Sequence, residues 1–520
     1  MSDDPHLAET SSGESVAASE TPIASITSAG VWGERCSQLC GFLMNHVWAV
    51  ASLVTLVVVL YAPVVHDKFL NLDDLAYVVD NDLIKSWHPL NLWRVLTEPV
   101  ARNFAPLNIG LFLGEYTLWG LNPGGYHATN LVLHAINAVL VFALMKQLTK
   151  NSWTAWIVAA LFAVHPLQIE SVAWVSSQKT LLSSMFMLLC GLCYLRPQRT
   201  GRDEAWGLLW LALGLLSKAS VVVVPPIVVA YDVLVSRKSF SAAAGRQAVP
   251  VFLCVLLTYI TMSAQFTVGG GLRGHLELNK LQIIGVDATL MCRYLAMLAV
   301  PRGLCVFYDP PFRGIAPQIA ASLLAWGGLT AFLWVKREKY PQLAFALATW
   351  LWLLFPVMNF FPITTLMNDR YMYLPCLVVF TVVALACSRC GAWLTGNGEA
   401  SPLTRVVSIA TTATLSIAIV GAYLMASMNY LPVWRNPLTL WEHARQQTPS
   451  LPIVHIQWAD ALYRSGDVPG ALAALEVAAK HPKLDEGNRS NIDTLRQEWS
   501  APLTVPHWSV EPAFSRDGGL

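Results

Sequence analysis

Apolar stretches long enough to cross a lipid bilayer recur along almost the whole chain. The first covers residues 47–65, and a helix of about 20 apolar residues spans the roughly 30 Å hydrocarbon core of a bilayer. Backbone polar groups in lipid must be paired within their own segment, so these stretches are expected to be helices. The predicted fold class is all-α, a polytopic membrane protein of about eleven transmembrane helices. The remaining stretches are 127–148, 153–173, 181–195, 205–216, 219–234, 249–266, 315–335, 341–361, 371–388 and 406–431.

The composition fits a membrane protein better than a soluble one. Hydrophobic residues make up 55% of the 520 residues and charged residues 13%, whereas about 25% charged residues is usual in a soluble domain. The formal net charge of +1 argues against a nucleic-acid partner. The cysteine pairs Cys36 with Cys40 and Cys387 with Cys390 lack a second His or Cys pair at zinc spacing. No metal ligands are therefore assigned, and the residues do not decide whether a divalent metal assists.

Lysine and arginine residues indicate which helix ends face the cytoplasm. Such residues collect in the cytoplasmic connections of membrane proteins. Here they occur at alternate ends, in the connections 146–150, 196–202, 237–246 and 336–339. This pattern predicts a cytoplasmic N-terminus, an outer loop at 66–126 and an extracytoplasmic tail after residue 431. The membrane would be the bacterial inner membrane if the chain is bacterial.

One apolar stretch is expected to behave differently from the others. Residues 281–300 carry Asp287 and Arg293, and charged side chains are costly within a span. A helix lying in the membrane interface is favoured for this stretch over a further span.

Three parts follow from the changes in composition. Residues 1–40 are rich in Ser, Thr, Ala and acidic residues and have no apolar face, so a disordered cytoplasmic tail is expected. Residues 41–431 form the polytopic domain, and 432–520 form the extracytoplasmic tail. Small and large residues alternate from Ala459 to Pro482 as in a tetratricopeptide helix pair. A single pair buries little surface, so it is expected to pack against the membrane domain or a partner chain; a helical hairpin without a binding role is the alternative.

Two adjacent carboxylates, Asp73 and Asp74, follow closely behind the first apolar stretch. A carboxylate at a membrane boundary loses hydration, which raises its pKa and makes it a better proton acceptor. Adjacent aspartates are also common in turns and helix caps. The local residues leave both readings open.

Other polar residues interrupt apolar stretches and indicate a cavity lined by protein. His165, next to Pro166, and Glu170 lie in the stretch 153–173, and Lys218 lies between two apolar stretches. A phosphate or a carboxylate such as Glu170 would satisfy Lys218, and a backbone carbonyl would satisfy His165. Arg370 could hold a phosphate by two parallel hydrogen bonds or pair with Asp369.

Ordered motifs along the chain resemble one family. The chain is similar to the transmembrane and tetratricopeptide-repeat O-mannosyltransferase-like proteins and their bacterial relatives, within the C-type (GT-C) membrane glycosyltransferase superfamily. No single motif is decisive, but the ordered set is fairly specific. The matching segments are Asn71-Leu72-Asp73-Asp74, 120–127 with Asn130 and His134, 162–166, 170–174, 215–218, Asp369-Arg370-Tyr371-Met372-Tyr373-Leu374-Pro375, Trp434-Arg435-Asn436 and Leu440-Trp441.

The resemblance implies an enzyme of protein glycosylation. Such transferases move a sugar, with mannose as one candidate, from a polyprenyl-phosphate carrier to an extracytoplasmic acceptor, with protein as one candidate. By resemblance, Asp73 or Asp74 is the catalytic carboxylate. Lys218 and Arg370 would neutralise the lipid phosphate, with His165 and Glu170 completing the substrate-binding set. The partners implied are the lipid-linked sugar donor, the acceptor and membrane lipid.

Two other functions compete with a transferase. A non-catalytic membrane scaffold would use its tetratricopeptide unit to bind a partner and would not need Asp73 or Asp74. A transporter is expected to show two halves with repeated broken-helix patterns, and the sequence shows no such repetition.

The charge pattern predicts that the tail after residue 431 lies outside the cytoplasm. A Ser490→Cys variant should react with a membrane-impermeant maleimide in intact cells. Labelling that appears only after the membrane is opened would reverse the predicted topology.

Overall fold

The computed structural model describes residues 41, 44–101, 103–269, 278–360, 365–394, 402–484 and 486–500. The expected disordered tail at 1–40 lies outside the described residues. The chain divides into two units, Met1–Val50 and Ala51–Leu520. In the first, the described residues are mostly helical and include the start of α2 (Val47–Tyr61).

Helices make up all the regular elements of the described ranges, apart from one isolated bridge between Val100 and Asn103. Five are long and apolar enough to cross a membrane. The all-α, multi-pass membrane fold expected from the sequence is confirmed. The five candidate spans are Val47–His66, α5 (Pro123–Thr149), α13 (Lys280–Ala299), α14 (Ala316–Val335) and Val406–Trp434 within α17 (Pro402–Tyr430) and η9 (Leu431–Trp434). They include the stretch 281–300, for which the sequence favoured a helix in the membrane interface.

The expected number of about eleven spans is not confirmed. Two further apolar segments are bent pairs, Ser152–Val164 with Pro166–Ala173 at 58° and Phe240–Arg246 with Ala248–Ser263 at 54°, which raise the number of candidate spans to at most seven in the described residues. Other expected stretches form shorter apolar helices, such as Ala219–Leu234 and Pro341–Val357. The difference arises because prolines and 3₁₀ turns break these stretches.

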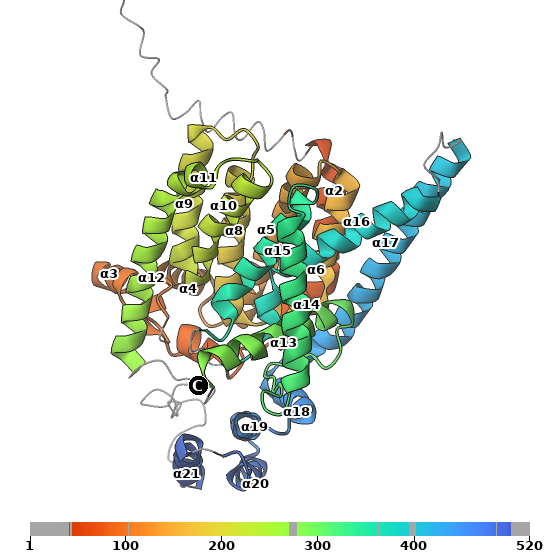
Figure 1. Cartoon of the computed structure of the whole chain (residues 1–520). Helices are drawn as coiled ribbons and strands as arrows, with labels where there is room; N and C mark the ends of the chain where they lie inside the picture. Colours follow the sequence, from red (N-terminus) through yellow and green to blue (C-terminus); the bar gives the residue numbers. More distant parts are fainter. Residues whose placement is uncertain are drawn as a thin grey trace, which may run out of the picture. The chain divides into compact units, whose positions relative to one another are not determined.

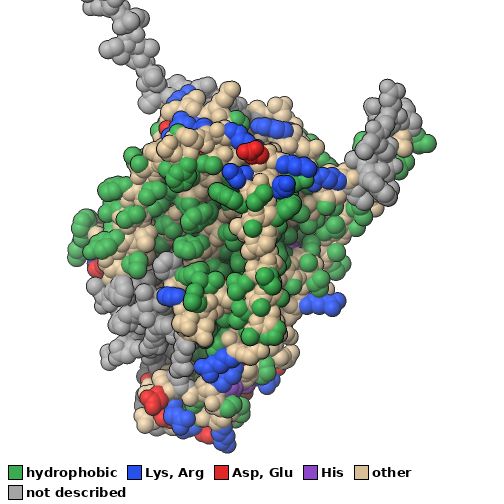
Figure 2. Space-filling view, viewed as in Figure 1, with side chains coloured by type: hydrophobic (Ala, Val, Ile, Leu, Met, Phe, Trp, Pro, Cys, Tyr) green, Lys and Arg blue, Asp and Glu red, His purple; other side chains and the backbone are tan. Residues whose placement is uncertain are grey.

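The outer surface of the helices is apolar. In α14, for example, Leu324 is 76% exposed and Val335 70% exposed. Figure 2 shows hydrophobic side chains over the middle of one face, with Lys and Arg side chains gathered toward the end where α11 (Phe240–Arg246) lies. Large apolar surfaces of this kind are stable against lipid and not against water. The protein is an integral, multi-pass membrane protein.

A break after α6 (Ser152–Val164) shapes the centre of the helical unit. Pro166 cannot donate a backbone hydrogen bond, and the chain turns there through the short η4 (Pro166–Gln168) into α7 (Ile169–Ala173). α6 packs against α5 and against α16 (Cys376–Leu394), while α5 also packs against α8 (Gln178–Tyr194). The break places Glu170, in α7, at full burial among these helices.

The loop 66–126, expected on the outer side of the membrane, is folded rather than extended. It contains the helical turns η2 (Leu75–Val79) and η3 (Asp82–Ile84) and the helices α3 (Pro89–Thr97) and α4 (Pro106–Trp119). Their apolar side chains form one buried cluster that includes Val175 from the segment after α7. The cluster consists of Tyr77, Val78, Leu83, Ile84, Val95, Val100, Ile109, Phe112, Leu113, Tyr126 and Val175.

Four helices follow the last span: α18 (Pro437–Gln447), α19 (Pro452–Ser465), α20 (Val468–Ala479) and α21 (Glu486–Ser500). Figure 1 shows them together at the end of the second unit opposite α11. The expected helical hairpin is α19 with α20, which turn at Gly466 with φ at +95°, a value that favours glycine. The two helices share a buried apolar cluster with α21.

Asp74 binds the segment after α7 and so holds the start of the loop 66–126 in place. Its Oδ1 accepts hydrogen bonds from the backbone N of Ser176 at 2.8 Å and the Ser176 hydroxyl at 2.5 Å. Its Oδ2 accepts one from the backbone N of Leu70 at 2.9 Å. Burial raises the pKa of the Asp74 carboxyl to about 6, although these hydrogen bonds act to lower it.

These contacts predict a stability role for Asp74. An Asp74→Asn variant should lose about 1–3 kcal/mol, because the amide NH₂ group would face a backbone or hydroxyl donor and leave it unpaired. Thermal unfolding in detergent measures this loss. The matched Asp73→Asn variant should unfold close to the wild-type temperature, since the Asp73 side chain is 40% exposed; equal losses in both variants would contradict the assignment.

Candidate active site

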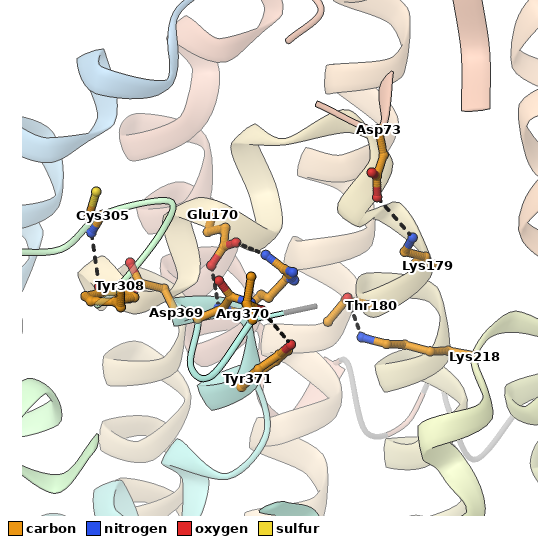
Figure 3. Close-up of polar contacts among 12 residues, drawn as sticks. Asp73, Glu170, Lys179, Thr180, Lys218, Cys305, Tyr308, Asp369, Arg370 and Tyr371 are labelled. Atoms are coloured by element: carbon orange, nitrogen blue, oxygen red, sulfur yellow. Dashed lines mark hydrogen bonds and ion pairs between the residues drawn. The ribbon is translucent and has the colours of Figure 1, made fainter. Parts of the chain in front are cut away.

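Charged side chains from five separate segments meet beneath the loop 66–126. Asp73 comes from the turn before η2, Glu170 from α7, Lys179 from the first turn of α8, and Arg370 from η8 (Asp369–Met372). Lys218 stands between α9 (Gly201–Ser217) and η6 (Ala219–Val223). Figure 3 shows these groups and their polar contacts.

Asp73 presents its carboxylate toward Lys179. The Asp73 Oδ2 and Lys179 Nζ atoms are 3.7 Å apart, and the Asp73 side chain keeps 40% of its surface exposed. Lys179 also donates a hydrogen bond of 3.1 Å to the hydroxyl of Tyr77 and lies 4.3 Å from the centre of the Tyr77 ring. Asp73 is thus both held in place and open to solvent, whereas its neighbour Asp74 is fully buried.

Glu170 and Arg370 form a buried ion pair. The carboxylate of Glu170 accepts from the Arg370 guanidinium and, at 2.7 Å, from the Arg370 backbone N. The guanidinium carbon also lies 5.1 Å from the centre of the Trp174 ring, a distance suited to a cation–π contact. Glu170 is fully buried and Arg370 is 19% exposed, so removing either partner would leave an unpaired charge.

Lys218 has a neutral partner. Its ammonium donates to the Thr180 hydroxyl at 3.0 Å, and no ion pair of Lys218 occurs within the described ranges. Burial, together with the positive charges of Lys179 and Arg370, lowers the pKa of Lys218 to about 7. An anion arriving beside Lys218 would reverse this effect and favour the charged form.

The cluster as a whole carries an excess of positive charge. Lys179, Lys218 and Arg370 provide three cations, and Asp73 and Glu170 provide two anions. Arg370 acts electrostatically on both lysines, so the cations share one region. Such an arrangement is suited to a phosphate whose negative charge increases during a reaction.

A third carboxylate, Asp369, borders the cluster on the side away from Asp73 (Figure 3). Asp369 is fully buried, and its Oδ1 accepts a 2.5 Å hydrogen bond from the Tyr308 hydroxyl. Burial and the charge of Glu170 raise the pKa of Asp369 well above its ordinary value. Tyr308 also lines a cleft of about 440 Å³ with Arg293, Arg302 and Met367.

The six residues singled out from the sequence do not all belong to this cluster. Glu170, Lys218, Arg370 and Asp73 do, while Asp74 anchors the loop. His165 has backbone partners, since its Nδ1 accepts from Leu167 N at 3.2 Å and its Nε2 lies 3.1 Å from the Leu298 carbonyl oxygen. These contacts agree with one of the expectations from the sequence, that backbone groups would satisfy the His165 ring.

The partners Tyr77 and Tyr308 did not stand out in the sequence. Each is a tyrosine in a non-periodic segment, and its contact is with a residue more than 60 positions away. Lys179 had a sequence signal, because it begins an apolar stretch. No group of three His, Cys, Asp or Glu side chains suited to a metal ion occurs in the part of the chain that the structure describes.

Two solved structures align with most of this chain. ArnT from Cupriavidus metallidurans bound to undecaprenyl phosphate aligns over 88% of this chain and 90% of its own, with 12% identity and a TM-score of 0.41. The Archaeoglobus fulgidus oligosaccharyltransferase with a tethered acceptor peptide aligns over 89% of this chain and 60% of its own, with 12% identity and a TM-score of 0.45.

No family model matches the chain, but curated relatives do. The mouse protein O-mannosyl-transferase TMTC3 is 28% identical over 244 residues, 44% of this chain and 24% of that protein. The Drosophila melanogaster Tmtc2 is 28% identical over 237 residues, 45% of this chain and 22% of that protein. Human TMTC1 is 32% identical over 140 residues, 25% of this chain and 16% of that protein.

These matches span less than a quarter of the length of each relative. They are all to proteins of one kind, the protein O-mannosyl-transferases. The resemblance of this chain to the transmembrane and tetratricopeptide-repeat O-mannosyltransferase-like family is confirmed.

Proposed function

We propose that this protein is a membrane glycosyltransferase that moves a sugar from a polyprenyl-phosphate carrier to an extracytoplasmic acceptor. The observation that carries the proposal is the excess of cations beside a half-exposed carboxylate, in a chain similar to protein O-mannosyl-transferases. The names of those relatives favour mannose as the sugar and a protein hydroxyl as the acceptor. The outer loop and the helices α18 to α21 lie on the acceptor side in this proposal, and the N-terminus is cytoplasmic.

Asp73 is the group that accepts the proton of the acceptor hydroxyl. The hydroxyl oxygen attacks the anomeric carbon of the sugar as its proton passes to the Asp73 carboxylate. The bond from the anomeric carbon to the phosphate oxygen breaks, and its electron pair leaves with the phosphate. Lys179, 3.7 Å from Asp73, fixes the carboxylate that performs this step.

The cations stabilise the departing phosphate. Lys218 is best placed for this role, because its recorded partner is the neutral Thr180 hydroxyl and an anionic oxygen would be a stronger one. Arg370 adds positive charge from within its pair with Glu170. A phosphate that gains negative charge in the transition state is held more tightly than the intact donor, which is the requirement for catalysis.

The proposed function predicts that the protein has transfer activity. Purified protein in nanodiscs should transfer labelled sugar from one member of a panel of polyprenyl-phosphate sugars to an acceptor peptide. Asp73→Asn should reduce kcat by about 10²- to 10⁴-fold, the usual contribution of a proton-accepting side chain. Donor binding and unfolding temperature should stay near wild type, since Asp73 is half exposed.

Full activity in Asp73→Asn would remove the proposed role of the carboxylate. Turnover of no donor in the panel by the wild-type protein would favour the scaffold alternative. Asp74→Asn serves as the neighbouring control, and its effect should follow its loss of stability.

The second prediction separates the two basic residues that we place near the phosphate. Lys218→Met should weaken binding of the polyprenyl phosphate at nearly unchanged stability, because no carboxylate is left unpaired. Arg370→Met should lower stability by about 3–5 kcal/mol, because Glu170 would lose its partner. Melting temperature and lipid-phosphate affinity are measured on the same samples.

The pKa of Lys218 gives this prediction a pH test. Because that pKa is lowered to about 7, the ammonium loses its proton as pH rises, and phosphate affinity should fall between about pH 6 and about pH 8. Lys218→Arg should bind with little pH dependence in that range, because arginine stays charged. Equal affinity in Lys218→Met and wild type at every pH would exclude Lys218 from the phosphate site.

A further inference from the structure

A buried polar contact joins the start of the outer loop to the C-terminal helices. Asn71 is 5% exposed and Trp441, in α18, is fully buried. The indole N of Trp441 donates a 2.6 Å hydrogen bond to Asn71 Oδ1. Asn71 Nδ2 in turn donates to Asp460 Oδ2 at 2.7 Å and to the Gln457 side-chain oxygen at 3.3 Å. The amide of Asn71 is therefore paired at both ends with residues of α18 and α19.

Such a contact restrains the loop strongly. A buried amide that loses its partners retains the cost of its lost hydration, so each of these hydrogen bonds disfavours movement of Asn71 away from α18. Asn71 is two residues before Asp73, the proposed proton acceptor. Movement of the Asp73 carboxylate is limited by this attachment, by the hydrogen bonds of the adjacent Asp74 and by the contact of Asp73 with Lys179.

Trp441 also contacts a second segment beside the site, residues 304–309. Its ring stacks on Phe307 with centroids 5.8 Å apart and planes inclined at 24°. Phe307 precedes Tyr308, whose hydroxyl donates to Asp369 beside the Glu170–Arg370 pair. One indole thus touches both loops, the one that carries Asp73 and the one that supports Asp369 and Arg370.

Other contacts hold the segment 304–309 against the C-terminal helices. Asp309 Oδ2 accepts from Lys483 Nζ and from the Ser450 hydroxyl, both at 2.6 Å. The His443 ring lies 2.9 Å from the Leu304 carbonyl oxygen. These bonds attach the segment 304–309 to α18 and its neighbours, and Trp441 is the residue that links this attachment to Asn71.

We propose that Asn71 and Trp441 are positioning residues: through them the C-terminal helices set the distance between Asp73 and the basic residues of the phosphate site. The catalytic reading of this contact rests on the proposed function, whereas the contact itself does not. A base that moves about 1 Å away from the acceptor hydroxyl loses much of its rate advantage. Substrate binding by Lys218 and Arg370 does not depend on this restraint.

The test uses a substitution that removes one hydrogen bond and keeps the ring contact. Trp441→Phe in the full-length protein retains an aromatic ring against Phe307 but has no N–H for Asn71. The control is Trp458→Phe in α19, whose indole faces Arg445 at 5.8 Å and makes no recorded contact with Asn71. Asn71→Ala provides a second variant that attacks the same contact from the loop.

Hydrogen–deuterium exchange tests the restraint without any turnover. Trp441→Phe and Asn71→Ala should each accelerate exchange at residues 67–80, with α20 and α21 unchanged. Trp458→Phe should exchange as wild type at 67–80. Wild-type exchange at 67–80 in both contact variants, or equal acceleration in Trp458→Phe, would overturn the restraint even if transfer activity is never found.

Steady-state kinetics test the catalytic consequence of the restraint. Both contact variants should lower kcat by about 10- to 100-fold with donor KM within about twofold of wild type. The double variant should be no slower than the slower single one, because the two changes remove the same contact. A double variant whose loss in kcat equals the product of the two single losses would overturn the positioning role. A change in donor KM without a change in kcat would also overturn it. If Trp441→Phe does not fold, Asn71→Ala decides both measurements.

Discussion

The buried ion pair of Glu170 and Arg370 is the contact around which the centre of this protein is built. A full charge in the low-dielectric interior of a membrane protein is stable only beside an opposite charge with its hydrogen bonds satisfied. Glu170 meets this condition by binding both the guanidinium and the backbone N of Arg370. The pair therefore joins α7, produced by the break at Pro166, to η8, which begins the segment leading into α16.

The site extends from this pair in two directions, and each is held by a loop outside the helices. Lys179 binds Asp73 of the loop 66–126, and Tyr308 of the segment 304–309 binds Asp369. Both loops rest on the C-terminal helices through Asn71, Phe307 and Asp309. The C-terminal helices are thus part of the structure that supports the site, which explains how one short helical hairpin can be stable without the neighbouring repeats it would otherwise need.

The sequence predicted the charged residues of the site better than their arrangement. Charges within apolar stretches are costly, and this cost alone pointed to Glu170, Lys218 and Arg370. Asp73 and Asp74 could not be separated, because burial of one and exposure of the other depend on Ser176, about one hundred residues later. The contact between Asn71 and Trp441 joins residues 370 positions apart, and no periodicity carries that information. The expected number of spans is not confirmed, because apolar composition does not show where prolines and 3₁₀ turns divide a helix.

Lys218 shows why the charge distribution favours a bound anion over a purely structural network. Arg370 has Glu170, and Lys179 has Asp73, so two cations are neutralised within the protein. Lys218 is left with the hydroxyl of Thr180, which offsets little of the cost of a half-buried ammonium repelled by two other cations. Stability alone does not account for a lysine at this position, because no carboxylate depends on Lys218 for a partner. In the proposed function this ammonium receives the phosphate of a lipid carrier in each catalytic cycle, and it must be weakly paired beforehand to bind that phosphate.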